Sequence, residues 1–154
     1  MNADDKPGHI CRYSPASPGL EWPVIGHEWA VGTLSESIRT GRLHHAYLLT
    51  GLPGIGKRTL ALTFVQALLC SETRAPCLNC RNCSLIAQGK HPDVTILNPQ
   101  VSGKLIKRGK IVIEQMRALI HQFSLTPIEI SQRVAFIPEF ETATEAAANA
   151  LLKT

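Results

Sequence analysis

The chain lacks the long apolar runs that mark membrane-spanning and exported proteins. No apolar stretch among its 154 residues approaches the roughly 18 residues that a transmembrane helix needs. The polar start, MNADDKPGHICRYSPASPG, has no apolar core of the signal-peptide kind, and we interpret residues 1–21 as an N-terminal tail. The sequence therefore predicts a cytoplasmic protein without a membrane partner.

A disulfide framework is also missing. The five cysteines are odd in number, and a cytoplasmic compartment keeps thiols reduced, so Cys11 is expected to be a free thiol and the other four need another explanation. The chain has no internal repeat and no low-complexity segment. Its 44% apolar content suits one globular domain, which we expect over residues 22–154.

Strong charge of one sign is absent as well. The net charge is +4, and the basic residues cluster only at Lys104, Lys107, Arg108 and Lys110. This run indicates a solvated loop, with a phosphate-contacting patch as the alternative.

Hydrophobic periodicity predicts alternating helices and strands. Three segments carry apolar residues at helical intervals: 28–38, which Gly41 would stop, the stretch that follows Lys57, and 113–123. Three short apolar runs predict strands over 45–50, 94–97 and 134–137. Thr142 and Glu145 have capping-box spacing, so a last helix is expected to follow them and to run to Thr154.

The stretch GLPGIGKRT lies between the first predicted strand and the second predicted helix, which puts Leu60, Phe64, Ala67 and Leu68 on one face. Strand, glycine loop, lysine and helix together are typical of a P-loop, in which backbone N–H groups at a helix N-terminus hold phosphates. The predicted nucleotide-binding residues of this degenerate P-loop are Gly51, Gly54, Ile55, Gly56, Lys57 and Arg58.

Two groups that hydrolysis requires are missing. Arg58 occupies the position of the hydroxyl that binds Mg²⁺, and Thr59 is rotated by about 100° away from it on a helix. In RVAFIPE, Pro138 stands where hydrolysing P-loop proteins carry a metal-directed acid, and only the second acid, Glu139, remains. We therefore predict no catalytic residue, whereas ATP binding stays possible.

Cys70, Cys77, Cys80 and Cys83 form C-x6-C-x2-C-x2-C after the P-loop helix. This spacing suits the tetrahedral four-cysteine coordination of structural zinc and predicts a small zinc module at 70–83. An iron–sulfur cluster is one alternative, although the trailing Cys-Pro of a ferredoxin run is missing. Four unligated thiols are the other.

The segments HHAYLLTG, HPDVTILNP, IEQMRALIHQFSLTP and ANALLKT accompany the P-loop and the cysteine module. Together they resemble the bacterial DNA polymerase III clamp loader, an AAA+ assembly, over nearly all of residues 22–154. The resemblance implies an α/β fold of the AAA+ P-loop type, with a parallel sheet and flanking helices. Two subunit types share this layout. The gamma/tau motor keeps the hydroxyl and the acid, and delta-prime subunits often lose them, so Arg58 and Pro138 place the chain with delta-prime.

The resemblance also implies a function. A delta-prime subunit is a non-hydrolysing stator, with gamma/tau and delta as partners, in a ring that opens the sliding clamp and loads it on primed DNA. It is classed with its holoenzyme as a DNA-directed DNA polymerase. The zinc would be structural, and Val24 to Gly26 would lie where AAA+ relatives receive adenine. The family's trans-acting arginine motif has no match here.

AAA+ sheets have the strand order 5-1-4-3-2, so both neighbours of the first strand are missing here, and the chain stops within a predicted helix. We therefore expect an AAA+ domain that is incomplete at its C-terminus. Two other functions stay open. One is an active ATPase motor of the gamma/tau type or another AAA+ protein, and the other is a zinc-dependent nucleic-acid-binding module, for which the cysteine segment offers only Arg74 and Arg81.

Overall fold

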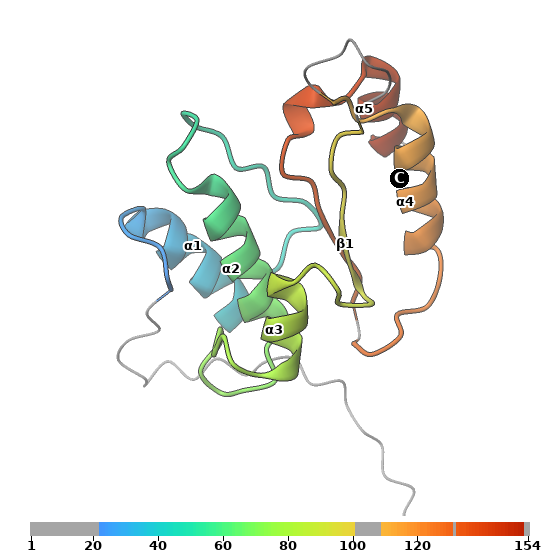
Figure 1. Ribbon diagram of the computed structural model, residues 1–154. Helices are drawn as coiled ribbons and strands as arrows, with labels where there is room; N and C mark the ends of the chain where they lie inside the picture. The colour runs from blue at the N-terminus through green and yellow to red at the C-terminus, as the bar shows by residue number, and fades with distance from the viewer. Residues whose placement is uncertain (1–21, 101–108, 131, 153–154) are drawn as a thin grey trace, which may run out of the picture. The chain divides into compact units, whose positions relative to one another are not determined.

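The computed structural model describes residues 22–100, 109–130 and 132–152 and divides the chain into two compact units, one ending at His91 and one beginning at Pro92. Figure 1 shows both units. The predicted tail with Cys11 lies outside the described residues, as do Lys104, Lys107 and Arg108. One domain over 22–154 stays a prediction. No described helix has the length and apolarity that crossing a bilayer requires.

The first unit contains three helices, α1 (Glu28–Arg39), α2 (Lys57–Leu69) and α3 (Arg81–Ala87). Both α1 and α3 contact α2, which lies between them in Figure 1. The predictions of α1 and α2 are confirmed, whereas α3 was not predicted. Helix α2 is therefore the element around which this unit is organised.

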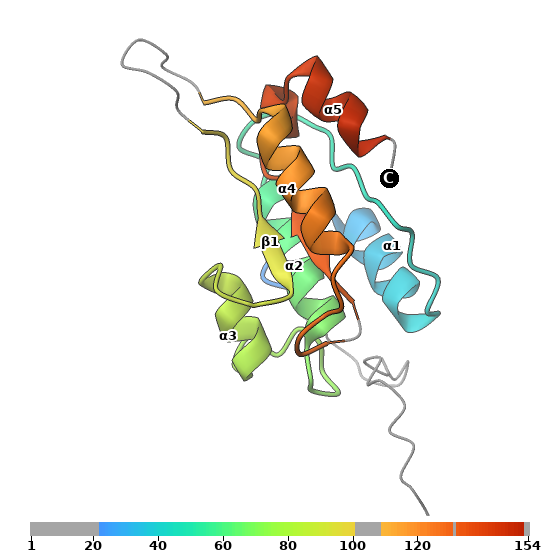
Figure 2. The same cartoon turned by 90° about the vertical axis from the view of Figure 1, so that its right-hand side faces the viewer.

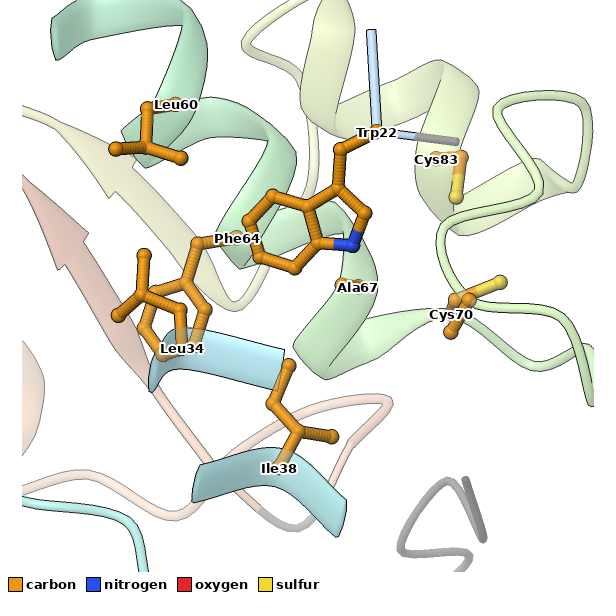
Figure 3. Packing of buried hydrophobic residues seen from close by; sticks show 9 residues of the cluster. Trp22, Leu34, Ile38, Leu60, Phe64, Ala67, Cys70 and Cys83 are labelled. Atoms are coloured by element: carbon orange, nitrogen blue, oxygen red, sulfur yellow. The ribbon is translucent and has the colours of Figure 1, made fainter. Parts of the chain in front are cut away.

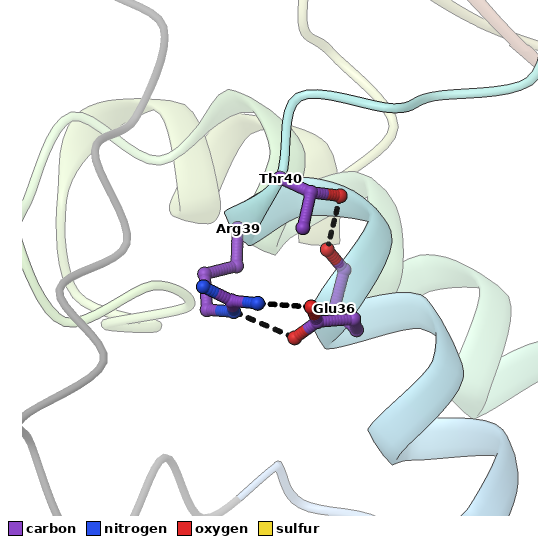
Figure 4. Close-up of polar contacts among 3 residues, drawn as sticks. All are labelled: Glu36, Arg39 and Thr40. Atoms are coloured by element: carbon purple, nitrogen blue, oxygen red, sulfur yellow. Dashed lines mark hydrogen bonds and ion pairs between the residues drawn. The ribbon is translucent and has the colours of Figure 1, made fainter.

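Side-chain and backbone hydrogen bonds end helix α1 at Arg39. Leu34 and Ile38, four residues apart, are its buried positions. At its end the backbone N–H and the hydroxyl of Thr40 both donate to the carbonyl of Glu36, at 2.9 and 2.8 Å. The Glu36 carboxylate pairs with the Arg39 guanidinium (Figure 4). Because this ion pair is exposed, it adds little stability, and the carbonyl contacts end the helix close to the predicted stop at Gly41.

The core of the first unit gathers on one face of α2. Leu60, Phe64 and Ala67 are buried there as predicted, whereas Leu68 is half-buried. Aromatic rings pack on Phe64 from two sides, with centroid distances of 6.4 Å to Trp22 and 4.9 Å to Tyr47. Figure 3 shows that the cluster extends from α1 to the cysteine segment; its buried members are Trp22, Leu34, Ile38, Leu60, Phe64, Ala67, Cys70, Ala75 and Cys83.

The second unit contains β1 (Val94–Ile96), α4 (Ile113–Phe123), β2 (Val134–Phe136), the short 3-10 helix η1 (Phe140–Thr142) and α5 (Glu145–Leu151). The two strands pair in parallel, with Val94 opposite Val134. Helices α4 and α5 pack side by side (Figure 2), and the core consists of Ile111, Met116, Leu119 and Ala147. Strand, helix and adjacent parallel strand agree with the predicted order, in which the second and third strands are neighbours.

Two local predictions are wrong. Residues 45–50 form no strand, because within the described part of the chain nothing pairs with them; the sheet there has two strands, β1 and β2. The last helix is capped by Thr144, whose hydroxyl accepts from the N–H of Ala147 at 3.3 Å, and not by Thr142, which belongs to η1. That helix ends at Leu151, and its predicted end at Thr154 lies outside the described residues.

Asp93, at the start of β1, is almost fully buried, with 1% of its surface exposed. Its carboxylate accepts hydrogen bonds from three successive backbone N–H groups, those of Ile128, Glu129 and Ile130, at 2.7, 2.7 and 3.0 Å. Burial acts to raise the pKa of Asp93, but these three donors outweigh it and hold the pKa below its usual value. The carboxylate thus fixes the loop that leads from α4 to β2.

Candidate metal centre and phosphate-binding loop

The sulfur atoms of Cys70, Cys77, Cys80 and Cys83 all lie within 4.8 Å of one another. The separation is 3.9 Å between the sulfurs of Cys70 and Cys80 and 4.0 Å between those of Cys77 and Cys83. A tetrahedral ion with metal–sulfur bonds of about 2.3 Å would separate its thiolates by about 3.8 Å. The four sulfurs therefore stand close to the geometry that one metal ion needs, and the predicted ligand set is brought together in space.

Backbone N–H groups point at three of these sulfurs. Cys77 accepts from the N–H of Cys80 at 3.2 Å, Cys80 from that of Cys83 at 3.4 Å, and Cys70 from that of Glu72 at 3.5 Å. In the Cys77–Cys80 turn, Leu78 has a left-handed φ of 61°, which is uncommon for a residue with a branched side chain. The backbone N–H groups that donate to sulfur stabilise negative charge on it, so they favour the thiolate form of these cysteines.

Burial opposes these hydrogen bonds, because it favours the neutral thiol over the thiolate. It raises the pKa of Cys70 to about 11 and also raises that of Cys83, which is fully buried. For Cys80 the effect of burial is outweighed by hydrogen bonds from Cys83 and Ser71, which lower the pKa to about 6. Because thiols are poor ligands and thiolates good ones, a bound cation would supply the charge that makes four adjacent thiolates stable.

Two amide side chains, which the sequence analysis missed, join this segment to α2. The Gln66 side chain donates to the backbone carbonyl of Cys83 at 2.9 Å, and Asn82 donates to the carbonyl of Leu69 at 2.9 Å. Gln66 is 7% exposed, so its bond is shielded from water. Asn82 lies inside the C-x2-C step, but Gln66 is 17 residues from its partner, and no spacing rule connects them.

The predicted P-loop surrounds the N-terminus of α2. Gly56 is the residue before the helix, with a left-handed φ of 92° and no side chain that caps the helix. Gly51 has a φ of 147°, and a Cβ there would lie 2.7 Å from the side chain of Ile55. Both positive φ values favour glycine, and the first N–H groups of α2 have no intrahelical partner, which is the arrangement that attracts anions.

Lys57, the first residue of α2, folds back over the loop. Its ammonium group donates to the carbonyls of Gly51 at 2.7 Å and Leu52 at 2.8 Å. Arg58 follows it, exposed, and the first turn of α2 holds no acidic residue. Two cations at the positive end of a helix are unfavourable by about 0.3–1 kcal/mol each, and a bound anion would offset this cost.

His27 contacts the loop from the segment before α1. Its Nε2 lies 2.8 Å from the carbonyl oxygen of Ile55 and must carry the proton, because a carbonyl only accepts. A trans peptide points its C=O and its N–H in opposite directions, so this bond turns the N–H of Gly56 away from His27. The sequence analysis missed this contact; the predicted adenine segment, Val24 to Gly26, directly precedes it.

Pro138 and Glu139 follow β2 in the second unit. Glu139 is exposed, and its carbonyl accepts from the N–H and the hydroxyl of Thr142, at 2.9 and 2.7 Å. Because Glu139 is exposed, its carboxylate faces solvent, and the neighbouring Pro138 has no carboxylate.

A family model described as DNA polymerase III, delta subunit, matches residues 26–154. The chain belongs to this family. It is 40% identical over 121 residues to the DNA polymerase III subunit delta' of Bacillus subtilis and 38% identical over 117 residues to that of Yersinia pestis; these matches cover 78% and 75% of the chain. The resemblance to the delta-prime subunit type is thereby confirmed.

Subunits of the other type are similar too. The DNA polymerase III subunit tau/gamma of Haemophilus influenzae is 32% identical over 133 residues, or 85% of the chain. The matches cover 35%, 33% and 18% of the Bacillus, Yersinia and Haemophilus proteins, so the chain spans about a third of the delta' relatives.

Proposed function

We propose that this chain acts in DNA replication as a delta-prime-type, non-hydrolysing subunit of the DNA polymerase III clamp loader. The gamma/tau and delta subunits would be its partners in the cytoplasm, and the sliding clamp and primed DNA would be met through the complex. The observation that carries this proposal is Arg58, on the exposed first turn of α2, where a motor subunit has a Mg²⁺-binding hydroxyl. A cation at that position repels the ion that hydrolysis requires.

The phosphate loop would then bind nucleotide without turning it over. The uncapped N-terminus of α2, Lys57 and Arg58 supply positive potential for phosphates. Binding requires Lys57 to exchange its two carbonyl contacts for phosphate oxygens, which are stronger acceptors. Arg58 can offset the charge of the phosphates, but it cannot bridge their oxygens as Mg²⁺ does while the leaving group departs.

The cysteine centre would hold one structural zinc ion through Cys70, Cys77, Cys80 and Cys83. The sulfur separations suit a single ion, whereas an iron–sulfur cluster spreads its thiolates around several irons. When bound, the ion would cross-link the segment after α2 to the start of α3. This cross-link would maintain the fold and would take no part in nucleotide chemistry.

The test is steady-state phosphate release by the isolated protein. Lys57→Ala, which removes the phosphate-binding ammonium, reveals any contaminating ATPase. We expect the isolated protein and Lys57→Ala to give the same background rate. Release well above background that Lys57→Ala abolishes would contradict the proposal and favour a motor of the gamma/tau type, which the 32% identity to tau/gamma keeps as the second candidate.

Binding gives a complementary measurement. The double variant Arg58→Thr with Pro138→Asp restores both Mg²⁺ contacts and should increase Mg²⁺-dependent ATP binding more than either single change does. The two single variants are the matched controls for the double variant. Equal Mg²⁺ dependence in the wild type and the double variant would show that these two positions do not limit metal binding.

A further inference from the structure

Among the described residues, the indole N–H of Trp22 is a buried donor that has no acceptor. Trp22 is 7% exposed, and its Nε1 has no hydrogen-bond partner among the described residues. A buried, unsatisfied donor costs about 1–3 kcal/mol, so most are found paired. The ring itself is well accommodated, because it stacks on Phe64 with a centroid distance of 6.4 Å. Packing explains the ring but leaves the N–H unexplained.

Two residues of the cysteine centre belong to the same buried cluster as this donor. Trp22 belongs to the same buried cluster as Cys70 and Cys83, two of the four candidate metal ligands. In Figure 3 the six-membered ring is on the side of Phe64, and the five-membered ring, with its nitrogen, is on the side of Cys70 and Cys83. In this view the polar edge of the indole faces the side of the cluster on which Cys70 and Cys83 lie.

A cysteine sulfur accepts hydrogen bonds differently as a free thiol and as a metal-bound thiolate. A thiol sulfur accepts hydrogen bonds weakly, whereas a metal-bound thiolate carries negative charge and accepts them strongly. Four thiolates around one divalent cation leave a net charge of −2, which needs donors from its surroundings. The backbone N–H groups of Glu72, Cys80 and Cys83 already point at three sulfurs, and all of them come from the cysteine segment.

We propose that Trp22 is a positioning residue of the metal centre, whose indole N–H donates to a metal-bound thiolate of Cys70 or Cys83. This inference rests on the proposed metal site. The contact would give the unpaired indole N–H an acceptor and would connect Trp22, the first described residue, to the cysteine centre. Metal binding would then order the start of the first unit as well as the cysteine loop.

Nuclear magnetic resonance of the wild-type protein tests the contact directly. The chain has two tryptophans, and Trp29 is 78% exposed, so it serves as an internal control. In protein with ¹⁵N-labelled indoles, Zn²⁺ should move the Trp22 N–H signal downfield and leave the Trp29 signal in place; Trp29→Phe assigns the two. With ¹¹³Cd²⁺ in place of zinc, a scalar coupling between the metal and the Trp22 indole proton is expected.

Affinity gives the second readout. Trp22→Phe keeps an aromatic ring and removes the N–H, and it should weaken Zn²⁺ binding about 10- to 100-fold in competition with a chromophoric chelator. Trp29→Phe should bind like the wild type. Phe64→Leu loosens the packing around the indole and leaves its N–H, so it should lower the melting temperature and keep the ¹¹³Cd coupling.

The outcomes separate the two proposals. If elemental analysis finds bound zinc but the Trp22 signal responds no more than that of Trp29, the positioning role of Trp22 is refuted and the metal site stands. If Zn²⁺ and Cd²⁺ do not bind, both proposals fail. Equal zinc affinity of Trp22→Phe and Trp29→Phe would also refute the role of Trp22.

Discussion

Replacing Cys80 with serine separates the contribution of the metal from that of packing. Cys80 is only half-buried, so the loss of its sulfur removes little core contact. Its sulfur also caps α3 by accepting from the N–H of Cys83. A serine hydroxyl is a preferred helix cap, so the substitution should leave the metal-free protein as stable as before. Any large loss of stability must then come from the metal.

The size of that loss follows from the site. Sulfur separations of 3.9 and 4.0 Å need little rearrangement around an ion that prefers about 3.8 Å. The full binding free energy of a structural zinc site, about 10–16 kcal/mol, would therefore stabilise the fold. One ligand of four accounts for about 3 kcal/mol by equal division, which corresponds to a loss of about a hundredfold in affinity.

Two assays check this. Elemental analysis of freshly reduced wild-type protein should find about one zinc per chain. Denaturant unfolding should show that Cys80→Ser is less stable than the wild type in zinc-loaded protein and equal to it after chelation. Iron in place of zinc, absence of metal, or the same stability difference with and without chelator would refute the assignment.

Three further predictions concern other contacts. Asp93→Asn should lower the free energy of unfolding at pH 7 by about 2–4 kcal/mol in urea titrations, because charged hydrogen bonds contribute about 1.5–3 kcal/mol each and the amide retains one acceptor. The pKa of Asp93 is lower in the folded than in the unfolded protein, so its carboxylate contributes fully to stability above the unfolded pKa of about 3.9. This contribution is lost as the pH falls through the folded pKa. Asp93→Asn should not show this loss of stability, and an identical acid transition in both proteins would contradict the role of the carboxylate. His27→Phe removes the donor to the carbonyl of Ile55 and should shift the backbone amide resonance of Gly56, whereas His27→Gln, which keeps a donor, should leave it close to the wild-type position; equal shifts in both variants would exclude the orienting bond. Thr144→Ala should cost about 1 kcal/mol in thermal unfolding, more than Thr142→Ala, and the reverse order would mean that Thr142 is the cap.

Patterns that depend on one segment predicted the fold well. The apolar spacing of α1, α2 and α4 is a property of each helix alone, and the three helices form where it placed them. The grouping of the four cysteines also followed from local spacing, because two C-x2-C steps and one C-x6-C step limit where four sulfurs can meet.

Features that depend on distant partners were not predictable in the same way. The apolar run 45–50 predicted a strand, but a strand exists only where another backbone pairs with it, and apolarity does not reveal that partner. The contacts of His27 with Ile55 and of Gln66 with Cys83 span 28 and 17 residues and follow from packing. Helix α3 has seven residues, too few for a hydrophobic period to be visible.

The two candidate sites share one rigid element. Helix α2 begins at Lys57, which closes over the phosphate loop, and ends at Leu69, next to the first cysteine of the metal centre. Its last turns are joined to the cysteine segment by the hydrogen bonds of Gln66 and Asn82. A helix held at its C-terminal end keeps its N-terminal N–H groups in a fixed direction, because the backbone between them has no freedom to turn. A metal ion bound by the four cysteines would therefore also hold α2, and we expect chelation of that ion to weaken ATP binding in a titration; equal affinity before and after chelation would contradict this coupling.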